Sequence, residues 1–362
     1  MRLLQVINSL GAGGAETLVA NTSIHYKNAG IDVAILVLDP TPTPLHTKLR
    51  AHNIPILSIN AVGKSIYNPL NILKLRRLLK PFPLVHAHLF PTAYWLALAK
   101  LWGHTNIKLL YTEHNTTNRR RKLTVFKLLD RYIYKQFDSI ISISDAVDSS
   151  LKTHLGAAFH PKITKIYNGV DVAAFTNAQP YTKTALGLAA TDVLVIQVAS
   201  FTAQKDQATA IKALTLVPAH IKLALVGTGP LLQAAQAQVH ALNLTARVHF
   251  LGVRDDVPQL LKTADVVVLA SHYEGLSLSC IEGMASGAPF IASDTPGLGA
   301  IVKHHGLVFP DADAEALANH ITTLLDNPAL YTQTVANCLK RAADFDIHKM
   351  IQEHIQLYKR LN

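Results

Sequence analysis

The sequence predicts an α/β protein made of two doubly wound domains in tandem. Short runs of apolar and β-branched residues alternate with helical stretches from end to end, as in parallel sheets covered by helices. The 362 residues are too many for one ordinary α/β domain. The alternation pauses once, at small, polar and aperiodic residues over 173–183, and then starts again. We therefore expect two Rossmann-like domains, over residues 1–170 and 171–345, that face each other across a cleft.

The expected strands are short and fall into two groups. Those of the first domain are Leu3–Ile7, Val33–Val37, Leu84–His88, Lys108–Thr112 and Ser139–Ser142. A turn over residues 168–171 separates them from those of the second domain, which are Val193–Ala199, Lys222–Val226, Arg247–Leu251, Ala264–Ala270 and Pro289–Ala292. The last segment, about 346–362, has the pattern of an amphipathic helix, and we expect it to pack back on the first domain.

Composition excludes several classes of protein. Hydrophobic residues make up 49% of the chain and charged residues only 16%, which supports large buried cores and excludes a disordered chain. No apolar run reaches the roughly 18 residues that span a bilayer, and the N-terminus lacks the pattern of a secretion signal. The two cysteines, Cys280 and Cys338, form neither a disulfide framework nor a metal-binding spacing. These features predict a cytoplasmic protein.

The excess of positive over negative charge lies entirely in the first half of the chain. Residues 1–170 hold 21 Lys and Arg against 8 Asp and Glu, a net charge of +13, whereas residues 171–362 hold 13 against 16, a net charge of −3. Such asymmetry suggests that the first domain meets an anionic partner, which could be a membrane surface, a nucleic acid or an acidic substrate.

Two glutamates, Glu274 and Glu282, follow the end of a predicted strand. Residues 264–271 form a continuous apolar run typical of a buried parallel strand, and Glu274 lies in the loop after it. Glu282 is expected about two turns into the next helix, roughly on the same side. Ligands bind at the carboxyl edge of open parallel sheets, and carboxylates accept hydrogen bonds from vicinal hydroxyls. The pair suggests a site for a hydroxyl-rich ligand; the alternative is a helix-capping acid beside a solvated one.

Other strand ends carry residues suited to a phosphorylated ligand. The first strand runs into GAGGAE at residues 11–16, where glycines let the backbone approach an anion at a helix start. This spacing lacks the third glycine of a dinucleotide-binding fingerprint. Lys205 follows another strand, and Gly227 and residues 252–256 follow two more. Each alone could be a plain turn or a solvated lysine, but several such loops around one ligand are harder to explain by chance.

Together these segments resemble the retaining glycosyltransferases of family 4, which have the GT-B fold. The resemblance covers essentially the whole chain and is most specific over residues 251–297. The matching segments are GAGGAE at 11–16, FTAQKD at 201–206, LVGTGP at 225–230, FLGVRDDV at 250–257 and EGLSLSCIEGMASGAPFIASD at 274–294.

The resemblance implies roles for individual residues. Lys205 would bind the donor diphosphate, Glu274 would contact the donor sugar near the reacting centre, and Glu282 would hold the ribose hydroxyls. His114 would reach the transferred sugar from the first domain, or else be a satisfied polar residue at a strand end. The other residues implied in donor binding are Gly13, Gly14, Ser200, Gly227, Val253, Arg254, Gly275, Leu276, Ser277 and Leu278. The amides of the last three would stabilise the leaving diphosphate at a helix start. Structural roles are expected for His86 and His88.

One departure from the family concerns positive charge. Many members carry an arginine where this chain has Ser200, five residues before Lys205. Arg254 and basic residues of the first domain are candidates for the missing charge. The resemblance implies no cofactor and no metal. Asp311 and Asp313 precede a helix, so we interpret them as capping residues far from the motif loops.

The basic first domain suggests where the acceptor binds. Residues 119–137 are rich in charge and apolar groups, and Lys127, Arg131 and Lys135 repeat on one helical face. The apolar residues on another face are Val125, Leu128, Leu129, Tyr132 and Ile133. This pattern suits a helix on an anionic membrane surface; the alternative is an ordinary surface helix with a cationic face.

The resemblance therefore implies a retaining, metal-independent hexosyltransferase, peripheral on the inner face of a cell membrane. It would move a sugar from a nucleotide diphosphate sugar, UDP in preference to GDP, to a glycan or lipid-linked acceptor. The setting would be bacterial cell-surface polysaccharide, lipopolysaccharide or glycolipid synthesis. A nucleotide-sugar 2-epimerase of the same fold and an inactive sugar-nucleotide-binding scaffold stay open as alternatives. A nucleic-acid-binding protein is a further rival, but no recognition motif is evident and no such partner is expected.

Overall fold

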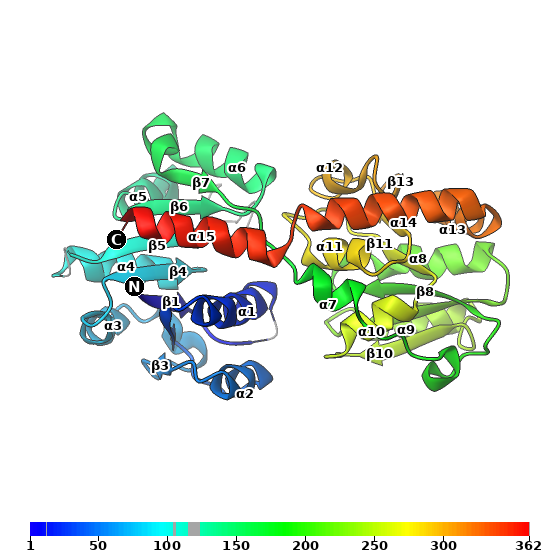
Figure 1. The fold of residues 1–362 in the computed structure, drawn as a ribbon, viewed down its shortest axis with the longest axis horizontal. Helices are drawn as coiled ribbons and strands as arrows, with labels where there is room; N and C mark the ends of the chain where they lie inside the picture. The colour runs from blue at the N-terminus through cyan, green and yellow to red at the C-terminus, as the bar shows by residue number, and fades with distance from the viewer. Residues whose placement is uncertain (12, 104–105, 115–123, 362) are drawn as a thin grey trace. The chain divides into compact units, whose positions relative to one another are not determined.

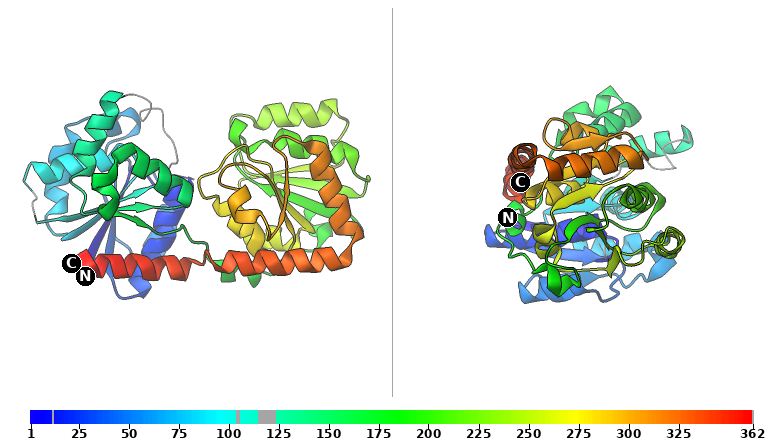
Figure 2. Two further views of the ribbon diagram at one scale, coloured as in Figure 1. Left: turned by 90° about the horizontal axis from the view of Figure 1, so that it is seen from above. Right: turned by 90° about the vertical axis from the view of Figure 1, so that its right-hand side faces the viewer.

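A computed structural model describes residues 1–11, 13–103, 106–114 and 124–361. The chain divides into two compact units, residues 1–168 with 347–362 and residues 169–346. Each unit contains one parallel sheet with helices on both faces (Figure 2). The prediction of two doubly wound α/β domains is confirmed.

In the described part of the first unit, seven parallel strands follow the order β3-β2-β1-β4-β5-β6-β7 (Figure 1). The strands are β1 (Arg2–Ile7), β2 (Asp32–Val37), β3 (Ile56–Ser58), β4 (Leu84–His88), β5 (Lys108–Glu113), β6 (Ser139–Ser142) and β7 (Ile163–Lys165). The helices are α1 (Gly14–Asn28), α2 (Pro44–Ala51), η1 (Gly63–Tyr67), α3 (Asn71–Leu79), α4 (Thr92–Leu101), α5 (Thr124–Tyr134), α6 (Asp145–Leu155), η3 (Ala157–Lys162) and α15 (Ile347–Leu361).

Side chains of β1 alternate between two cores, one on each face of this sheet. Leu4 and Val6 join a core that includes residues of α3, α4 and α5. Leu3 joins a core with Tyr26 of α1 and Tyr358 of α15. Because successive side chains of a strand point to opposite faces, both sides of the sheet are apolar and both need helical cover. The C-terminal helix α15 supplies part of that cover and packs against α1 (Figure 1).

In the second unit six parallel strands of the described chain follow the order β10-β9-β8-β11-β12-β13. The strands are β8 (Val193–Val198), β9 (Ile221–Val226), β10 (Val248–Gly252), β11 (Val266–Leu269), β12 (Phe290–Ser293) and β13 (Leu307–Phe309). The longer helices are α8 (Gln207–Ala213), α9 (Leu232–Ala241), α10 (Val257–Thr263), α11 (Leu278–Ala285), α13 (Ala314–Asp326) and α14 (Pro328–Ala343). The short helices are α7 (Val172–Thr176), η4 (Lys183–Leu186), η5 (Ala203–Lys205), η6 (Leu214–Leu216) and α12 (Gly299–Val302).

Every strand expected from the sequence is present, and its bounds agree with the expected ones to within two residues. Three strands were not expected: β3, β7 and β13, each three residues long and each at a sheet edge. Three residues are too few to show a strand periodicity, so such pieces become visible only once a neighbouring strand pairs with them. No helix in the described residues has both the length and the apolar character to cross a membrane.

Candidate active site

Lys205 and Glu274 form a buried ion pair in the second unit. Lys205 ends η5, just after β8, and Glu274 lies in the loop after β11, the strand paired with β8. The Lys205 ammonium donates a hydrogen bond to Oε1 of Glu274, and the two side chains are only 16% and 7% exposed. Parallel strands place their carboxyl ends at one sheet edge, so two residues 69 positions apart in sequence meet there.

The loop that carries Glu274 is held by its neighbours on both sides. The Glu274 amide donates to the Pro296 carbonyl at 2.9 Å, in the loop after β12. Gln204 donates through Nε2 to the Tyr273 carbonyl at 2.8 Å, and the same nitrogen lies 3.4 Å from Oε2 of Glu274. Sequence reasoning missed Gln204, whose only signal was its place beside Lys205 in FTAQKD.

The expectation that Asp311 lies far from the motif loops is wrong. Its Oδ1 is 2.7 Å from Nδ1 of His272, a residue two positions before Glu274. Asp313, by contrast, caps α13 by accepting a hydrogen bond from the Ala316 amide at 2.9 Å, as predicted. The bond to Asp311 raises the pKa of His272. Asp313 is therefore a capping residue, whereas Asp311 contacts the loop that carries Glu274.

Glu282 lies closer to the start of its helix than expected. Helix α11 begins at Leu278 with Ser277 as N-cap, so Glu282 is about one turn into the helix and not two. The residue is half-buried, and burial of its carboxyl group raises the pKa to about 7. The amides of Ser277 and Leu278 lie at the N-terminus, where the first N–H groups have no acceptor within the helix.

The loops after β9 and β10 contain three of the residues expected to bind the donor, Gly227, Val253 and Arg254. Gly227 has φ +134, and a Cβ at this position would overlap the carbonyl oxygen of Ala199, so close backbone packing alone requires glycine. Val253 is 68% exposed. Arg254 donates to both carboxylate oxygens of Asp256, at 2.8 and 2.5 Å, so its charge is already paired.

Ser200 stands at the start of the loop after β8 and is exposed. Its carbonyl oxygen accepts a hydrogen bond from Nε2 of Gln207 at 3.0 Å. The site around Lys205 therefore has a short neutral side chain where the resemblance implies an arginine, and Arg254, the expected substitute, is paired with Asp256.

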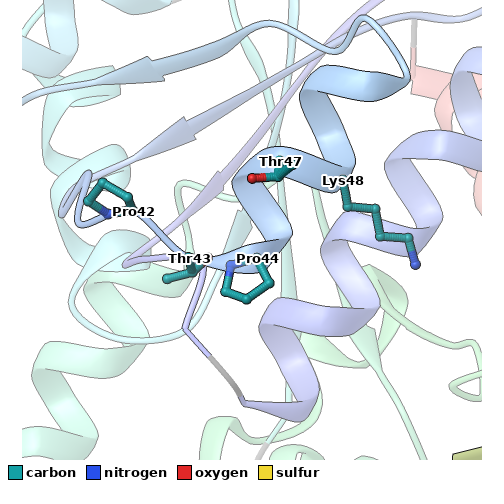
Figure 3. Close-up of a pocket in the computed structure, with 5 residues that line it drawn as sticks. All are labelled: Pro42, Thr43, Pro44, Thr47 and Lys48. Carbon is teal, nitrogen blue, oxygen red and sulfur yellow. The ribbon is translucent and has the colours of Figure 1, made fainter. Parts of the chain in front are cut away.

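In the first unit the glycine loop after β1 leads directly into α1. Gly13 is the N-cap of α1, and no heavy atom of the described residues lies within 4 Å of a Cβ built on Gly14. The start of α2 is tied to this loop, because Thr43 donates through Oγ1 to the Leu10 carbonyl at 2.5 Å. Residues Pro42, Thr43, Pro44, Thr47 and Lys48 line a shallow depression there (Figure 3). Sequence reasoning did not single out this depression.

His114 follows β5 and is half-buried beside His88, the last residue of β4. Nε2 of His114 lies 3.0 Å from Nδ1 of His88. Burial lowers the pKa of His114 to about 4 and the pKa of His88 well below its ordinary value, so both rings are neutral at neutral pH. His86 is also buried and contacts Thr112 and Tyr358.

Helix α5, which was predicted to lie on a membrane, has only part of the expected exposed apolar and basic faces. Arg119–Lys122, at its basic start, lie outside the described residues, as does the side chain of Val125. In α5, Ile133 is buried in the core, whereas Leu128 and Tyr132 are 66% and 56% exposed. Arg131 does not face solvent freely, because its Nε donates to the Leu155 carbonyl at 2.8 Å.

Both units match models of known protein families. The family model for glycosyl transferases group 1 matches residues 180–341, and that for Glycosyltransferase Family 4 matches residues 12–174. EpsF of Bacillus subtilis is 27% identical over 329 residues, 83% of each chain. The UDP-Gal:alpha-D-GlcNAc-diphosphoundecaprenol alpha-1,3-galactosyltransferase of Escherichia coli is 26% identical over 353 residues, 91% of this chain and 89% of that protein.

Solved structures agree on the fold. HepE of Anabaena, solved in complex with UDP and glucose, superposes with a TM-score of 0.86 over 100% of both chains at 22% identity. A sucrose-phosphate synthase from Thermosynechococcus elongatus superposes with a TM-score of 0.81. With family models matching nearly the whole of both units, the chain belongs to the family 4, group 1 glycosyltransferases of GT-B fold and is a glycosyltransferase.

Proposed function

We propose that this enzyme moves a hexose from a UDP-sugar to a glycan or lipid-linked acceptor, with retention at the anomeric carbon. The observation that carries the proposal is the buried pair of Lys205 and Glu274, one loop before the N-terminus of α11. A cation, a carboxylate and helix-start amides at one sheet edge suit a departing diphosphate and a hydroxyl-rich sugar. UDP is supported by the ligand of HepE and by the name of the E. coli relative, and the relatives' acceptors favour cell-surface glycan or glycolipid synthesis.

In this proposal Lys205 stabilises the negative charge on the leaving diphosphate. Its ammonium has three N–H donors and one of them goes to Glu274, which leaves donors for phosphate oxygens. The amides of Ser277 and Leu278, with those of Gly275 and Leu276 before them, would add to this stabilisation. With the charge met by these groups, the proposed reaction needs neither a metal ion nor a cofactor.

Glu274 is proposed to bind the sugar and to stabilise the transition state electrostatically, without forming a covalent bond. Oε1 accepts a hydrogen bond from Lys205, and Nε2 of Gln204 lies 3.4 Å from Oε2. A covalent bond to the sugar would neutralise the carboxylate and leave the buried Lys205 ammonium without its counter-ion. A front-face route, in which the leaving phosphate helps to deprotonate the acceptor hydroxyl, avoids that cost.

The remaining donor contacts are proposed from the place of each residue in its own unit. Glu282 would accept hydrogen bonds from the ribose hydroxyls, and the backbone at Val253 would lie against the base. Gly14, whose Cβ position has no described atom within 4 Å, would let backbone approach the diphosphate or the acceptor. His114 of the first unit would contact the transferred sugar.

We also propose that the first unit binds an anionic membrane surface from the cytoplasmic side. Between Asp39 and Glu113 the sequence contains no Asp or Glu. Within this stretch η1, α3 and the residues that flank them expose the apolar side chains of Val62, Tyr67, Leu70 and Leu73. The same segments expose the basic residues Lys64, Lys74, Arg77 and Lys80. This η1–α3 surface combines apolar groups for insertion with cations for lipid headgroups.

A donor screen followed by product analysis tests the proposed activity. Thermal stabilisation by UDP- and GDP-sugars identifies the donor, because a ligand that binds only the folded chain raises its stability. Incubation with that donor in labelled form, together with lipid-linked and glycan acceptors, should yield a glycoside whose anomeric proton coupling shows the donor's configuration. An inverted linkage contradicts retention, an epimer alone indicates an epimerase, and binding without turnover indicates an inactive scaffold.

A further inference from the structure

A chain of buried polar side chains connects His114 to the C-terminal helix through the interior of the first unit. His88 of β4 lies between His114 and Gln5 of β1, with Nδ1 3.0 Å from Nε2 of His114 and Nε2 2.6 Å from Oε1 of Gln5. Nε2 of Gln5 lies 3.4 Å from the hydroxyl of Tyr358 on α15. His88 and Gln5 are 5% and 1% exposed, so the chain is sealed from solvent along most of its length.

The far end of this chain is fixed by further hydrogen bonds. The Tyr358 hydroxyl lies 2.7 Å from Nδ1 of His86, whose Nε2 lies 2.7 Å from Oγ1 of Thr112. The same hydroxyl is 3.3 Å from that of Tyr26, which in turn lies 2.6 Å from Nδ1 of His354. The Tyr358 hydroxyl donates its one proton to Tyr26 and can only accept from Gln5, so Nε2 of Gln5 faces Tyr358 and Oε1 faces His88.

The orientation of Gln5 determines where the histidines carry their protons. An amide oxygen only accepts hydrogen bonds, so Nε2 of His88 must carry a proton to donate to Oε1 of Gln5. A neutral imidazole has one proton, which leaves Nδ1 of His88 as an acceptor. Nε2 of His114 must then donate to it. His114 is therefore left with an unprotonated Nδ1, which can accept a hydrogen bond but cannot donate one.

We propose that His88 is a positioning residue that holds His114 as the Nε2–H tautomer, so that Nδ1 of His114 selects a hydroxyl donor on the transferred sugar. The contact with the sugar rests on the function proposed above, whereas the tautomer rests on the hydrogen-bond chain alone. The chemistry selected is a C–OH group. A sugar nucleotide with fluorine in its place should be rejected as firmly as the deoxy sugar, because fluorine accepts but does not donate.

Two substitutions of His88 distinguish its proposed effect on the His114 tautomer from its contribution to packing. His88→Asn places an amide oxygen near the position of Nδ1, so His114 still finds an acceptor. His88→Leu fills a similar volume without an acceptor, and Nε2 of His114 loses the partner that fixes the tautomer. Tyr358→Phe is a third variant at the far end, which removes the hydroxyl that contacts Nε2 of Gln5, Nδ1 of His86 and the Tyr26 hydroxyl. UDP binding and the thermal transition report whether the rest of each variant is folded.

The readout is long-range ¹H–¹⁵N NMR of the full-length protein labelled on histidine nitrogens, with His114 assigned by its loss in His114→Asn. Wild type and His88→Asn should show a protonated Nε2 and an unprotonated Nδ1, whereas His88→Leu should show mixed tautomers. With the most active UDP-sugar of the donor screen, His88→Leu should lower kcat/KM about tenfold and His88→Asn less than about threefold. A wild-type proton on Nδ1, or an unchanged tautomer in both His88→Leu and Tyr358→Phe, overturns the proposal. Absence of sugar transfer leaves the NMR result intact and counts only against the proposed function.

Discussion

The ammonium of Lys205 donates a hydrogen bond to Oε1 of Glu274, and both side chains are shielded from solvent. Neither residue of such a pair is independent of the other. Lys205 neutralises a carboxylate that would otherwise be buried alone, and Glu274 fixes the ammonium at the sheet edge where a diphosphate would arrive. We therefore expect the loss of either partner to affect both the fold of the second unit and the proposed donor site.

Removing one partner should cost both stability and activity. Glu274→Gln and Lys205→Met should each lower the free energy of unfolding by about 3 kcal/mol, because each leaves a buried charge without its counter-ion. Each should also lower kcat at least about a hundredfold through lost transition-state stabilisation. Denaturant unfolding and steady-state kinetics measure the two effects. The double variant should be less destabilised than the sum of the singles; strict additivity would show that the pair is not coupled.

An arginine at position 200 should strengthen donor binding. Ser200 is exposed, so a longer side chain can be accommodated, and a guanidinium there would form charge-assisted hydrogen bonds to the diphosphate. Ser200→Arg should lower the Kd for UDP about tenfold, and added salt should reduce the gain. Calorimetric titration at two ionic strengths checks this, with Ser200→Gln as a neutral control of similar length. An equal gain in the glutamine variant would assign the effect to contact area and not to charge.

The sequence was sufficient for residues that stand directly after strands, and much less so for residues that act through other elements. Lys205 and Glu274 could be placed at one sheet edge because parallel strands share their carboxyl ends. The hydrogen bond between them could not be predicted, since it depends on their side-chain rotamers and on the contacts of Gln204 with the Glu274 loop. The link between His88 and Tyr358 was hidden for another reason: it joins β4 to α15, and packing of α15 on the sheet aligns these side chains only in three dimensions.

Glu282 should make donor binding and stability depend on pH in opposite directions. Burial raises the pKa of its carboxyl from 4.5 to about 7, so between these values the folded chain keeps a proton that the unfolded chain has lost. The folded state therefore loses stability as pH rises through this range. Only the carboxylate offers both oxygens to two ribose hydroxyls, so the affinity for UDP-glucose should rise about tenfold from about pH 6 to about pH 8 as the ionised fraction increases.

Glu282→Gln provides the control for this pH dependence. It should flatten the affinity profile and, without ligand, unfold at a higher temperature than wild type at about pH 8, because it buries no charge. UDP-glucose is the appropriate probe because its phosphodiesters do not titrate in this range. A wild-type affinity that is constant or falls with pH would contradict the assignment to ribose.

Gly297 should be essential for the position of Glu274. It has φ +90, and a Cβ there would overlap the backbone oxygen of Glu274. Gly297→Ala should displace the Glu274 loop, lowering kcat about a hundredfold and the free energy of unfolding by about 2 kcal/mol. Gly187→Ala is a matched control, because Gly187 has φ +76 but its Cβ would meet no described atom within 4 Å. Similar losses of activity in the two variants would show that backbone strain, and not the Glu274 contact, is responsible.

Vesicle binding should depend on the η1–α3 surface. Leu70, Leu73 and Arg77 lie at helical spacing on one side of α3, so an inserted leucine and a cation would engage the same patch of bilayer. Leu73→Glu and Arg77→Glu should each weaken sedimentation with anionic vesicles about tenfold at low salt, since each places a negative charge at an anionic surface. Leu216→Glu is the control: Leu216 is 54% exposed, against 53% for Leu73, but lies on η6 of the second unit. If all three variants lose binding alike, general charge is responsible; if wild type does not bind, the membrane proposal is wrong.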